Sequence, residues 1–158
     1  MRILRRDGSL CAELKVDRVG NLTGAFLYEA DLAGAVLDGM GLAGAELGGA
    51  KLQDAGLQNA NFYWADCMDA DLSRANLRGA DFRGAVLKNA VFRDATLDGA
   101  NLGLDNVGGR TQLQGADLSG ASVLGASFEG ALYDESTIFP DKFDPRARGM
   151  VKATKGNT

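Results

Sequence analysis

The chain has 158 residues, enough for one domain, and its formal net charge of −4 disfavours a dedicated nucleic-acid binder, which would normally be basic. It contains no histidine, so catalytic triads built on histidine are excluded and the commonest metal ligand is missing. Its two cysteines give no disulfide framework, no apolar run is long enough to span a bilayer, and the first residues lack the apolar stretch of a secretory signal. We therefore expect a cytoplasmic protein without a membrane segment.

The first 19 residues are expected to form an N-terminal cap that begins with a β-hairpin. Ile3 and Leu4 precede the pair Asp7-Gly8, and further apolar residues follow from Leu10. Asp-Gly between two apolar runs is a strong short-range hairpin signal. Residues 15–20 are expected to lead from this hairpin into the next segment.

Residues 20–134 repeat with a period of five. Seventeen consecutive repeat centres, from Leu22 to Leu102, are apolar, and from Leu27 onward an Ala stands two residues before each centre, with Met40 as the exception. Residues two apart in an extended segment point to the same side, so the centre and its Ala should both point inward. Amphipathic helices and strands have periods near 3.6 and 2 residues, so this pattern indicates a stacked repeat architecture.

The five-residue phase is disturbed after Leu102. Val107 keeps the spacing, although Asp105 stands in the place of Ala, and the next centre, Leu113, follows six residues later. The spacing then continues to Tyr133, which gives twenty-three repeats. We expect one extra residue at this point and no long loop projecting between the coils.

The array should end in a C-terminal cap formed by residues 135–150. Both prolines of the chain, Pro140 and Pro145, lie here, and a backbone ladder stops where proline cannot donate. Phe139 and Phe143 are available to cover the open end, which a repeat array needs. Residues 151–158 are expected to be a flexible tail.

The repeats resemble the pentapeptide repeat family. Each unit reads Ala, then Asp or Asn, then Leu or Phe, then two variable residues, most clearly in residues 70–84, and residues 139–145 resemble the C-terminal ends of many bacterial members. The resemblance implies an all-β fold, a right-handed quadrilateral parallel β-helix with four repeats in each coil and about six coils. Residues twenty apart should then lie one above another, so that Phe62 stacks on Phe82.

The centres should form the core of this solenoid, and we expect no catalytic, cofactor-binding or metal-binding residues. Cys67 is interpreted as a small apolar filler; the alternative is a reactive thiol, at an enzyme or metal site with nearby aspartates. The Asp or Asn before each centre is expected to bond local backbone at the corners. The central core residues are expected to be Leu57, Phe62, Cys67, Leu72, Leu77 and Phe82.

Outward-pointing aromatic residues mark a candidate partner patch. Tyr63 and Trp64 follow a repeat centre and should point outward, with Met68 around the next corner. Arg83 is expected near the face of Tyr63, and Leu104 lies two coils beyond Trp64 on the same line. Aromatic residues and Met are enriched at protein interfaces. The alternative interpretation is that Trp64 only lies along the wall of the column.

Charged residues are expected to polarise the column along its axis. The first two coils carry mostly acidic residues, and four consecutive repeats then place one cation on each face. This cationic belt consists of Arg78, Arg83, Lys88 and Arg93. Because its charges point in four directions, it is a poor groove for phosphate.

These observations favour a non-enzymatic structural or protein-interaction module whose protein partner the sequence does not identify. The family resemblance implies an alternative, a DNA mimic that binds DNA gyrase or topoisomerase IV and confers protection from gyrase poisons. Mimicry of DNA needs a sustained negative surface, which the cationic belt interrupts. A homodimer formed through an end of the tube is a further possibility. Direct nucleic-acid binding and membrane association are not expected.

Overall fold

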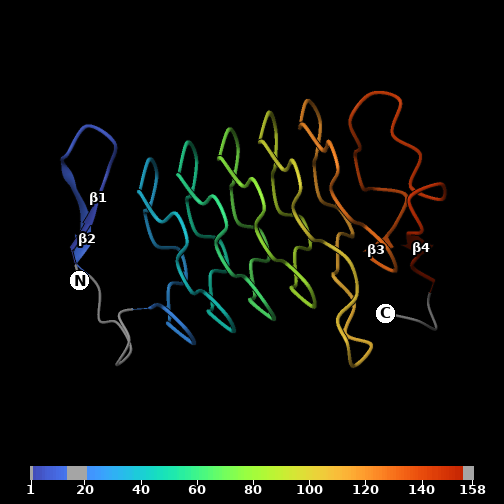
Figure 1. Cartoon of the computed structure of the whole chain (residues 1–158), viewed down its shortest axis with the longest axis horizontal. Helices are drawn as coiled ribbons and strands as arrows, with labels where there is room; N and C mark the ends of the chain where they lie inside the picture. The colour runs from blue at the N-terminus through green and yellow to red at the C-terminus, as the bar shows by residue number, and fades with distance from the viewer. Residues whose placement is uncertain (1, 14–20, 155–158) are drawn as a thin grey trace.

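The computed structural model describes residues 2–13 and 21–154, so the expected connection at residues 15–20 and the last four residues of the chain lie outside the described residues. The chain winds into a column of stacked coils, with a hairpin at one end and the C-terminal segment at the other (Figure 1). Over the described ranges, no helix is long and apolar enough to cross a membrane.

Backbone hydrogen bonds join each coil to the next in parallel register. The first paired positions are Phe26 and Glu46, and the spacing of twenty residues continues to the pair Asp81 and Asn101. Twenty residues per coil and five per repeat give four repeats per coil, one on each side of the column. The fold is therefore the expected right-handed quadrilateral parallel β-helix.

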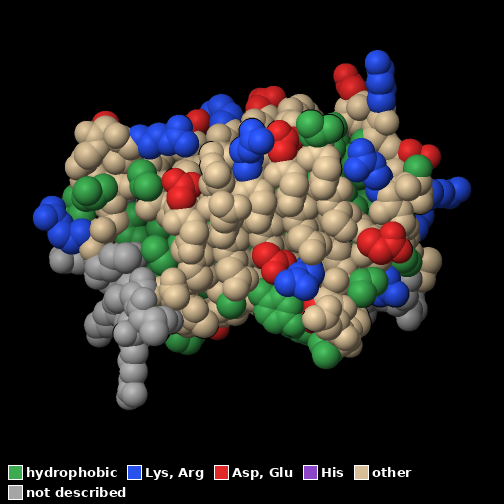
Figure 2. Space-filling view, in the orientation of Figure 1, with side chains coloured by type: hydrophobic (Ala, Val, Ile, Leu, Met, Phe, Trp, Pro, Cys, Tyr) green, Lys and Arg blue, Asp and Glu red, His purple; other side chains and the backbone are tan. Residues whose placement is uncertain are grey.

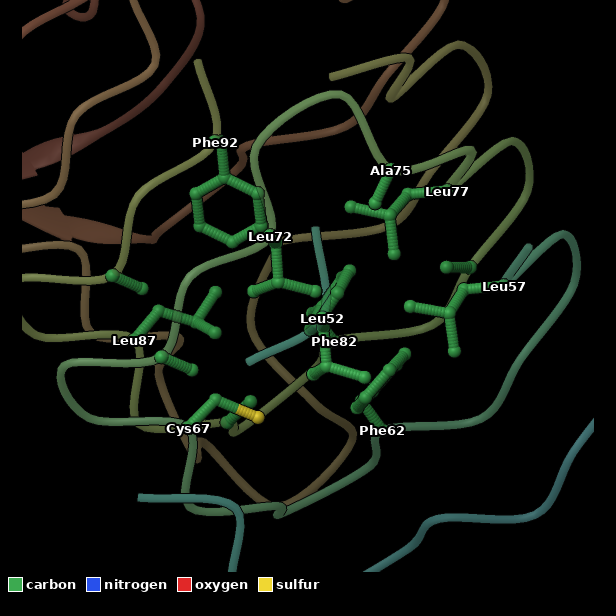
Figure 3. Close-up of a cluster of buried hydrophobic side chains, with 14 of the residues drawn as sticks. Leu52, Leu57, Phe62, Cys67, Leu72, Ala75, Leu77, Phe82, Leu87 and Phe92 are labelled. Carbon is green, nitrogen blue, oxygen red and sulfur yellow. The ribbon is translucent and has the colours of Figure 1, made fainter. Parts of the chain in front are cut away.

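The inward side chains gather in the interior of the column, where they form the core (Figure 3). Phe62 and Phe82 stack with ring centroids 4.5 Å apart and planes inclined by 10°, which confirms the predicted alignment of residues twenty apart. Phe92 meets Phe82 edge-on at 6.0 Å. Burial of each such side chain contributes about 1.5–3 kcal/mol before the entropy of ordering is counted. The six central core residues have no exposed surface: Leu57, Phe62, Cys67, Leu72, Leu77 and Phe82.

Each corner of the column is a four-residue turn from a repeat centre to the following Ala. In one of them the Ala60 N–H donates to the Leu57 carbonyl over 3.1 Å, and Asn59, the third residue, has φ of 57°. A positive φ at this position favours Gly or Asn. The polar residue before the centre supports the next turn, as expected: Asn61 Oδ1 accepts the Tyr63 N–H over 2.9 Å.

One loop interrupts the ladder between residues 103 and 110. Asp81 pairs with Asn101, twenty residues on, whereas Val86 pairs with Gln112, twenty-six residues on, so six residues are inserted. The loop projects from the column (Figure 1), and the Val107 side chain is 82% exposed. The expectations that Val107 is a repeat centre and that a single residue is extra were therefore wrong, and no long projecting loop was expected where these six residues are inserted. The step of eleven positions from Leu102 to Leu113 fits two repeats plus one residue or one repeat plus six, and spacing alone cannot distinguish these two arrangements.

The N-terminal hairpin consists of β1 (Arg2–Leu4) and β2 (Leu10–Glu13), which pair antiparallel. The Val36 N–H donates to the Leu4 carbonyl over 2.8 Å, and the Ile3 side chain is buried with the core. The hairpin thus joins the first coil at this end of the column.

The C-terminal segment pairs β3 (Leu132–Tyr133) with β4 (Val151–Lys152) in parallel. Val151 and Lys152 were expected in a flexible tail, and this was wrong: the Val151 N–H donates to the Ala131 carbonyl over 2.8 Å. The short polar sequence after residue 150 gives no sign of this pairing, because it depends on backbone groups alone.

Two phenylalanine rings lie over the end of the core, within the segment expected to form the C-terminal cap. Phe139 and Phe143 stack on each other with centroids 4.9 Å apart. Phe139 also packs edge-on against Tyr133, and Phe143 against Phe128, with centroids 5.6 and 5.1 Å apart. The rings thereby cover the last inward side chains of two faces.

Candidate functional site

The base of the projecting loop is organised around the side chain of Asp105, which is 1% exposed. Its Oδ1 accepts the backbone N–H groups of Val107, at 2.9 Å, and Gly109, at 2.6 Å. Its Oδ2 accepts the Tyr63 hydroxyl at 3.1 Å and the Trp64 indole N–H at 2.8 Å. One carboxylate therefore fixes the loop backbone to two aromatic side chains of an earlier coil.

The same hydrogen bonds determine the protonation of Asp105. Burial, the largest single influence, opposes the charged form, but the four hydrogen bonds together outweigh it and lower the pKa of Asp105 below its ordinary value of 3.8. The side chain is thus a carboxylate at neutral pH, with all four bonds donated to it.

Trp64 occupies a corner position that does not suit a bulky side chain. Its φ is 55°, in the left-handed region that Gly and Asn adopt more readily. Two glycines make room for its indole: a Cβ atom at Gly84 would lie 2.9 Å from Trp64 Nε1, and one at Gly109 would lie 2.6 Å from Cζ2. Backbone strain of this kind persists only where the surroundings hold it, and here the Trp64 N–H donates to the Arg83 carbonyl of the next coil over 3.1 Å.

Arg83 and Asp81 complete the polar side of this cluster. The Arg83 guanidinium forms an ion pair with Asp81, with Nη2 and Oδ2 2.6 Å apart. It also lies over the Tyr63 ring, with its central carbon 5.7 Å from the ring centroid. Tyr63 and Arg83 are only partly exposed, so their contacts are mainly internal.

The exposed part of the cluster is apolar. Trp64 is 52% exposed, Leu104 is 40% exposed, and Val107, on the loop, is 82% exposed. Figure 2 shows hydrophobic side chains gathered at the edge of the column from which the loop projects. We call these three residues the loop surface.

Met68, the fifth residue of the candidate partner patch, belongs to a different feature. It lines a hollow of about 330 Å³ together with Tyr28 and several carboxylates, and neither Tyr63 nor Trp64 lines it. The structure thus brings four of the five predicted patch residues around Asp105 and places Met68 elsewhere.

Sequence reasoning missed Asp105, Val107 and Tyr28 as surface determinants. Asp105 replaces an Ala that almost every other repeat keeps, and this substitution was the available signal. Nothing in the spacing indicates that its carboxylate reaches Trp64, forty-one residues earlier in the chain.

Two of the four residues of the cationic belt form ion pairs with neighbouring carboxylates. Arg83 pairs with Asp81, as described above, and Arg93 pairs with Asp117, with Nε and Oδ2 2.5 Å apart. Arg74, which is outside the belt, forms a two-point contact with Asp54 at 2.8 Å for each hydrogen bond. The belt therefore contributes less positive field than its arginine count suggests.

The residues considered for an enzyme or metal site do not come together. Burial raises the pKa of the Cys67 thiol strongly, which keeps it protonated and unreactive. In the parts of the chain that the structure describes, no three His, Cys, Asp or Glu side chains are placed to share a metal ion.

Comparison with known proteins identifies the repeats. The sequence model of pentapeptide repeats matches eight copies over residues 30–66, 65–103 and 110–132, and the break in this match coincides with the projecting loop. No curated protein is significantly similar to the chain.

Three solved structures illustrate the relationship. A pentapeptide repeat protein from Nostoc PCC 7120 is 34% identical, with 72% of this chain and 84% of that chain covered and a TM-score of 0.38. One from the Arabidopsis thaliana thylakoid lumen is 30% identical, covering 87% and 82%, with a TM-score of 0.48. QnrB1, a plasmid-mediated fluoroquinolone resistance protein, is 22% identical, covering 90% and 88%, with a TM-score of 0.44, and at this identity it does not bear on function. The repeat match and the first two identities show that the chain belongs to the pentapeptide repeat family.

Proposed function

We propose that this protein is a non-enzymatic interaction module that contacts a partner protein through the loop surface, Trp64, Leu104 and Val107. The observation that carries the proposal is the buried Asp105 carboxylate, which holds the loop backbone and Trp64 in one arrangement. A loop held in this way loses little entropy on binding, which favours association.

The chemistry of the chain supports a binding role rather than catalysis. The sequence lacks histidine, and the Cys67 thiol lies in the filled interior. The aspartates before the repeat centres accept backbone hydrogen bonds at the corners, as Asp66 Oδ1 does from the Met68 N–H over 3.0 Å. These groups are occupied by structural contacts of the coil.

The test compares substitutions at two exposed apolar residues on different parts of the column. Val107, at 82% exposure, lies on the loop, and Leu124, at 78% exposure, lies outside it. Immobilised wild type, Val107→Asp and Leu124→Asp are used to capture proteins from the native host, and captured proteins are quantified by mass spectrometry. We expect a partner that wild type and Leu124→Asp retain equally and that Val107→Asp loses by at least about tenfold. Equal capture by all three proteins would contradict a role for the loop.

A second candidate function is binding to DNA gyrase or topoisomerase IV in place of DNA. The ion pairs of Arg83 and Arg93 favour it, because they weaken the positive belt that interrupts an otherwise acidic column. A supercoiling assay with purified gyrase, with and without a gyrase poison, tests it. Protection from the poison supports this candidate, and no effect at micromolar protein dismisses it.

A further inference from the structure

The hollow between Tyr28 and Met68 is a surface separate from the loop, and its shape follows from the repeat. Tyr28, Gly48 and Met68 occupy equivalent places in three successive coils, as the bonds from the Glu29 N–H to the Gly48 carbonyl and from the Gly49 N–H to the Met68 carbonyl show, both 2.8 Å long. Gly48 contributes no side chain between the other two. The result is an open hollow of about 330 Å³ with a tyrosine at one side and a methionine at the other.

The walls of this hollow carry negative charge, and no cation from the described part of the chain pairs with it. Four carboxylates line it: Glu29, Glu46, Asp66 and Asp69. Asp66 accepts the Met68 N–H and Asp69 accepts the Asn89 amide, both at 3.0 Å. Among the described residues, no Lys or Arg forms an ion pair with any of the four, whereas four other aspartates of the column each pair with an arginine.

The apolar part of the hollow is open to solvent. The Tyr28 side chain is 70% exposed, and its ring rests against Gly48, where a Cβ atom would lie 3.0 Å from two ring carbons. Met68 is 38% exposed. An aromatic ring is thus displayed beside a group of carboxylates.

An aromatic face next to carboxylates is the environment that suits a guanidinium group. Arginine stacks its planar head on an aromatic ring and forms two-point hydrogen bonds with carboxylates, whereas lysine is a compact and strongly hydrated point charge. Phosphates and acidic peptides are repelled by the same charges. A shared metal ion is disfavoured because no three acidic side chains among the described residues are grouped closely enough to ligate one.

We propose that the Tyr28–Met68 hollow binds an arginine side chain presented by a cationic segment of a partner protein. The charge of the hollow selects the cationic segment, and the Tyr28 ring together with the nearby carboxylates selects arginine within it. This site goes beyond the loop surface and does not depend on it.

The binding experiment uses the full chain labelled with nitrogen-15 and the probe peptide acetyl-Gly-Arg-Gly-Arg-Gly-amide. We expect the amide resonances of Gly48, Gly49, Met68 and Asp69 to shift on titration. The matched peptide with Gln in place of Arg should give no shift, and the peptide with Lys should bind at least about threefold more weakly. Equal binding of the Gln or Lys peptide, equal binding of spermidine, or shifts confined to other residues would each overturn the proposal.

Two substitutions change the hollow without changing its charge. Gly48→Leu fills the hollow and displaces the Tyr28 ring, and Tyr28→Leu removes the ring. Each substitution should therefore weaken binding of the arginine peptide by about fivefold. Asp141→Asn, which removes an exposed charge outside the hollow, and Val107→Asp, on the loop, should leave the affinity unchanged. The amide spectrum of each variant reports directly whether it is folded. Unchanged affinity in both folded hollow variants contradicts the proposal, as does loss of affinity in either control.

Discussion

At the scale of single residues, the departures from the repeat consensus have specific contacts. Asp105 stands where an Ala is usual, and Trp64 stands at a corner that usually takes Gly, Asn or Asp, yet the two side chains are bonded to each other. Cys67 also departs from the Leu or Phe of a repeat centre, but it acts only as a filler in the core. Cys67 therefore changes only the packing of the core, whereas Asp105 and Trp64 together fix the base of the projecting loop.

Replacing Asp105 with Asn should release the loop from Trp64. The amide retains one acceptor oxygen, but its NH₂ group then faces N–H donors on the other side. Trp64 is the only tryptophan in the chain, so its fluorescence reports this contact directly. We expect a shift of its emission to longer wavelength and faster proteolysis between residues 103 and 110. Asp141→Asn serves as the control and should change neither; an unchanged spectrum in Asp105→Asn would show that the carboxylate does not hold the indole.

The same contact should depend on pH. Because the folded-state pKa of Asp105 lies below its ordinary value of 3.8, the stability that this carboxylate contributes is complete above that pH and is lost as the pH falls through the lowered pKa. We expect the Trp64 emission of the wild type to stay constant from pH 7 to pH 5 and to shift in the acid range below about 3.8. The Asp105→Asn variant should lack this transition, and a transition of equal size there would assign it to other carboxylates.

Cys67 should be chemically inert in the folded protein. Its side chain has no exposed surface, and burial raises the pKa of its thiol, so the reactive thiolate is not available. Iodoacetamide at pH 8 should leave Cys67 unmodified over hours in buffer and modify it fully in denaturant. Peptide mass spectrometry separates it from Cys11. Rapid modification of Cys67 in the native protein would instead indicate that its thiol is reactive.

At the scale of elements, the loop of residues 103–110 is an insertion into a continuous ladder. Removal of six residues, 104–109, brings Leu113 to five positions after Leu102 and leaves Thr111 in the place of the inward Ala. Thr111 is already fully buried, with its hydroxyl 2.9 Å from the Phe82 carbonyl oxygen. The backbone on either side of the loop can therefore be joined directly without changing which residues face the core.

Deletion of residues 104–109 combined with Arg110→Gly should therefore give a folded protein. Arg110 would take a corner position where glycine avoids the strain of a positive φ. We expect far-ultraviolet circular dichroism like that of the wild type and a single cooperative urea transition. The variant should no longer capture the partner protein that Val107→Asp loses. A deletion variant that does not fold would show that the loop is needed for the ladder to close.

At the scale of the whole molecule, a segment that does not follow the five-residue repeat packs against each end of the column. The hairpin of β1 and β2 joins the first coil, and the C-terminal rings lie over the last inward side chains. An uncovered end of a solenoid exposes apolar side chains and backbone groups that pair with another copy. We propose that Phe139 and Phe143 close their end against such pairing and that the protein is a monomer.

Substitution of both Phe139 and Phe143 with Ala should expose that end. Loss of these rings is expected to cost about 3–5 kcal/mol of unfolding free energy, measured by urea titration. Size-exclusion chromatography with light scattering should give a monomer for the wild type and concentration-dependent association for the double variant. The paired control Leu124→Ala, an exposed apolar residue, should change neither quantity. A wild-type dimer that the double substitution dissociates would instead make these rings an interface.

The sequence by itself determined the fold because an inward Leu or Phe and an Ala recur at a period that neither helix nor ordinary strand shares. That period sets which side chains face the axis and which residues stack, as the Phe62 and Phe82 rings show. Local rules of this kind repeat in every coil, so they are visible without knowledge of the rest of the chain.

Only the tertiary structure decided where the surface is interrupted and what the interruption contacts. The spacing from Leu102 to Leu113 admits two arrangements, and the choice depends on the burial of Thr111 and on the bonds from Asp105 to Trp64. The grouping of Met68 with Tyr28 across Gly48 follows the twenty-residue stacking, but the hollow between them depends on how the side chains pack. The contact of Asp105 with Trp64 joins residues forty-one positions apart through side-chain geometry, on which the five-residue period places no constraint.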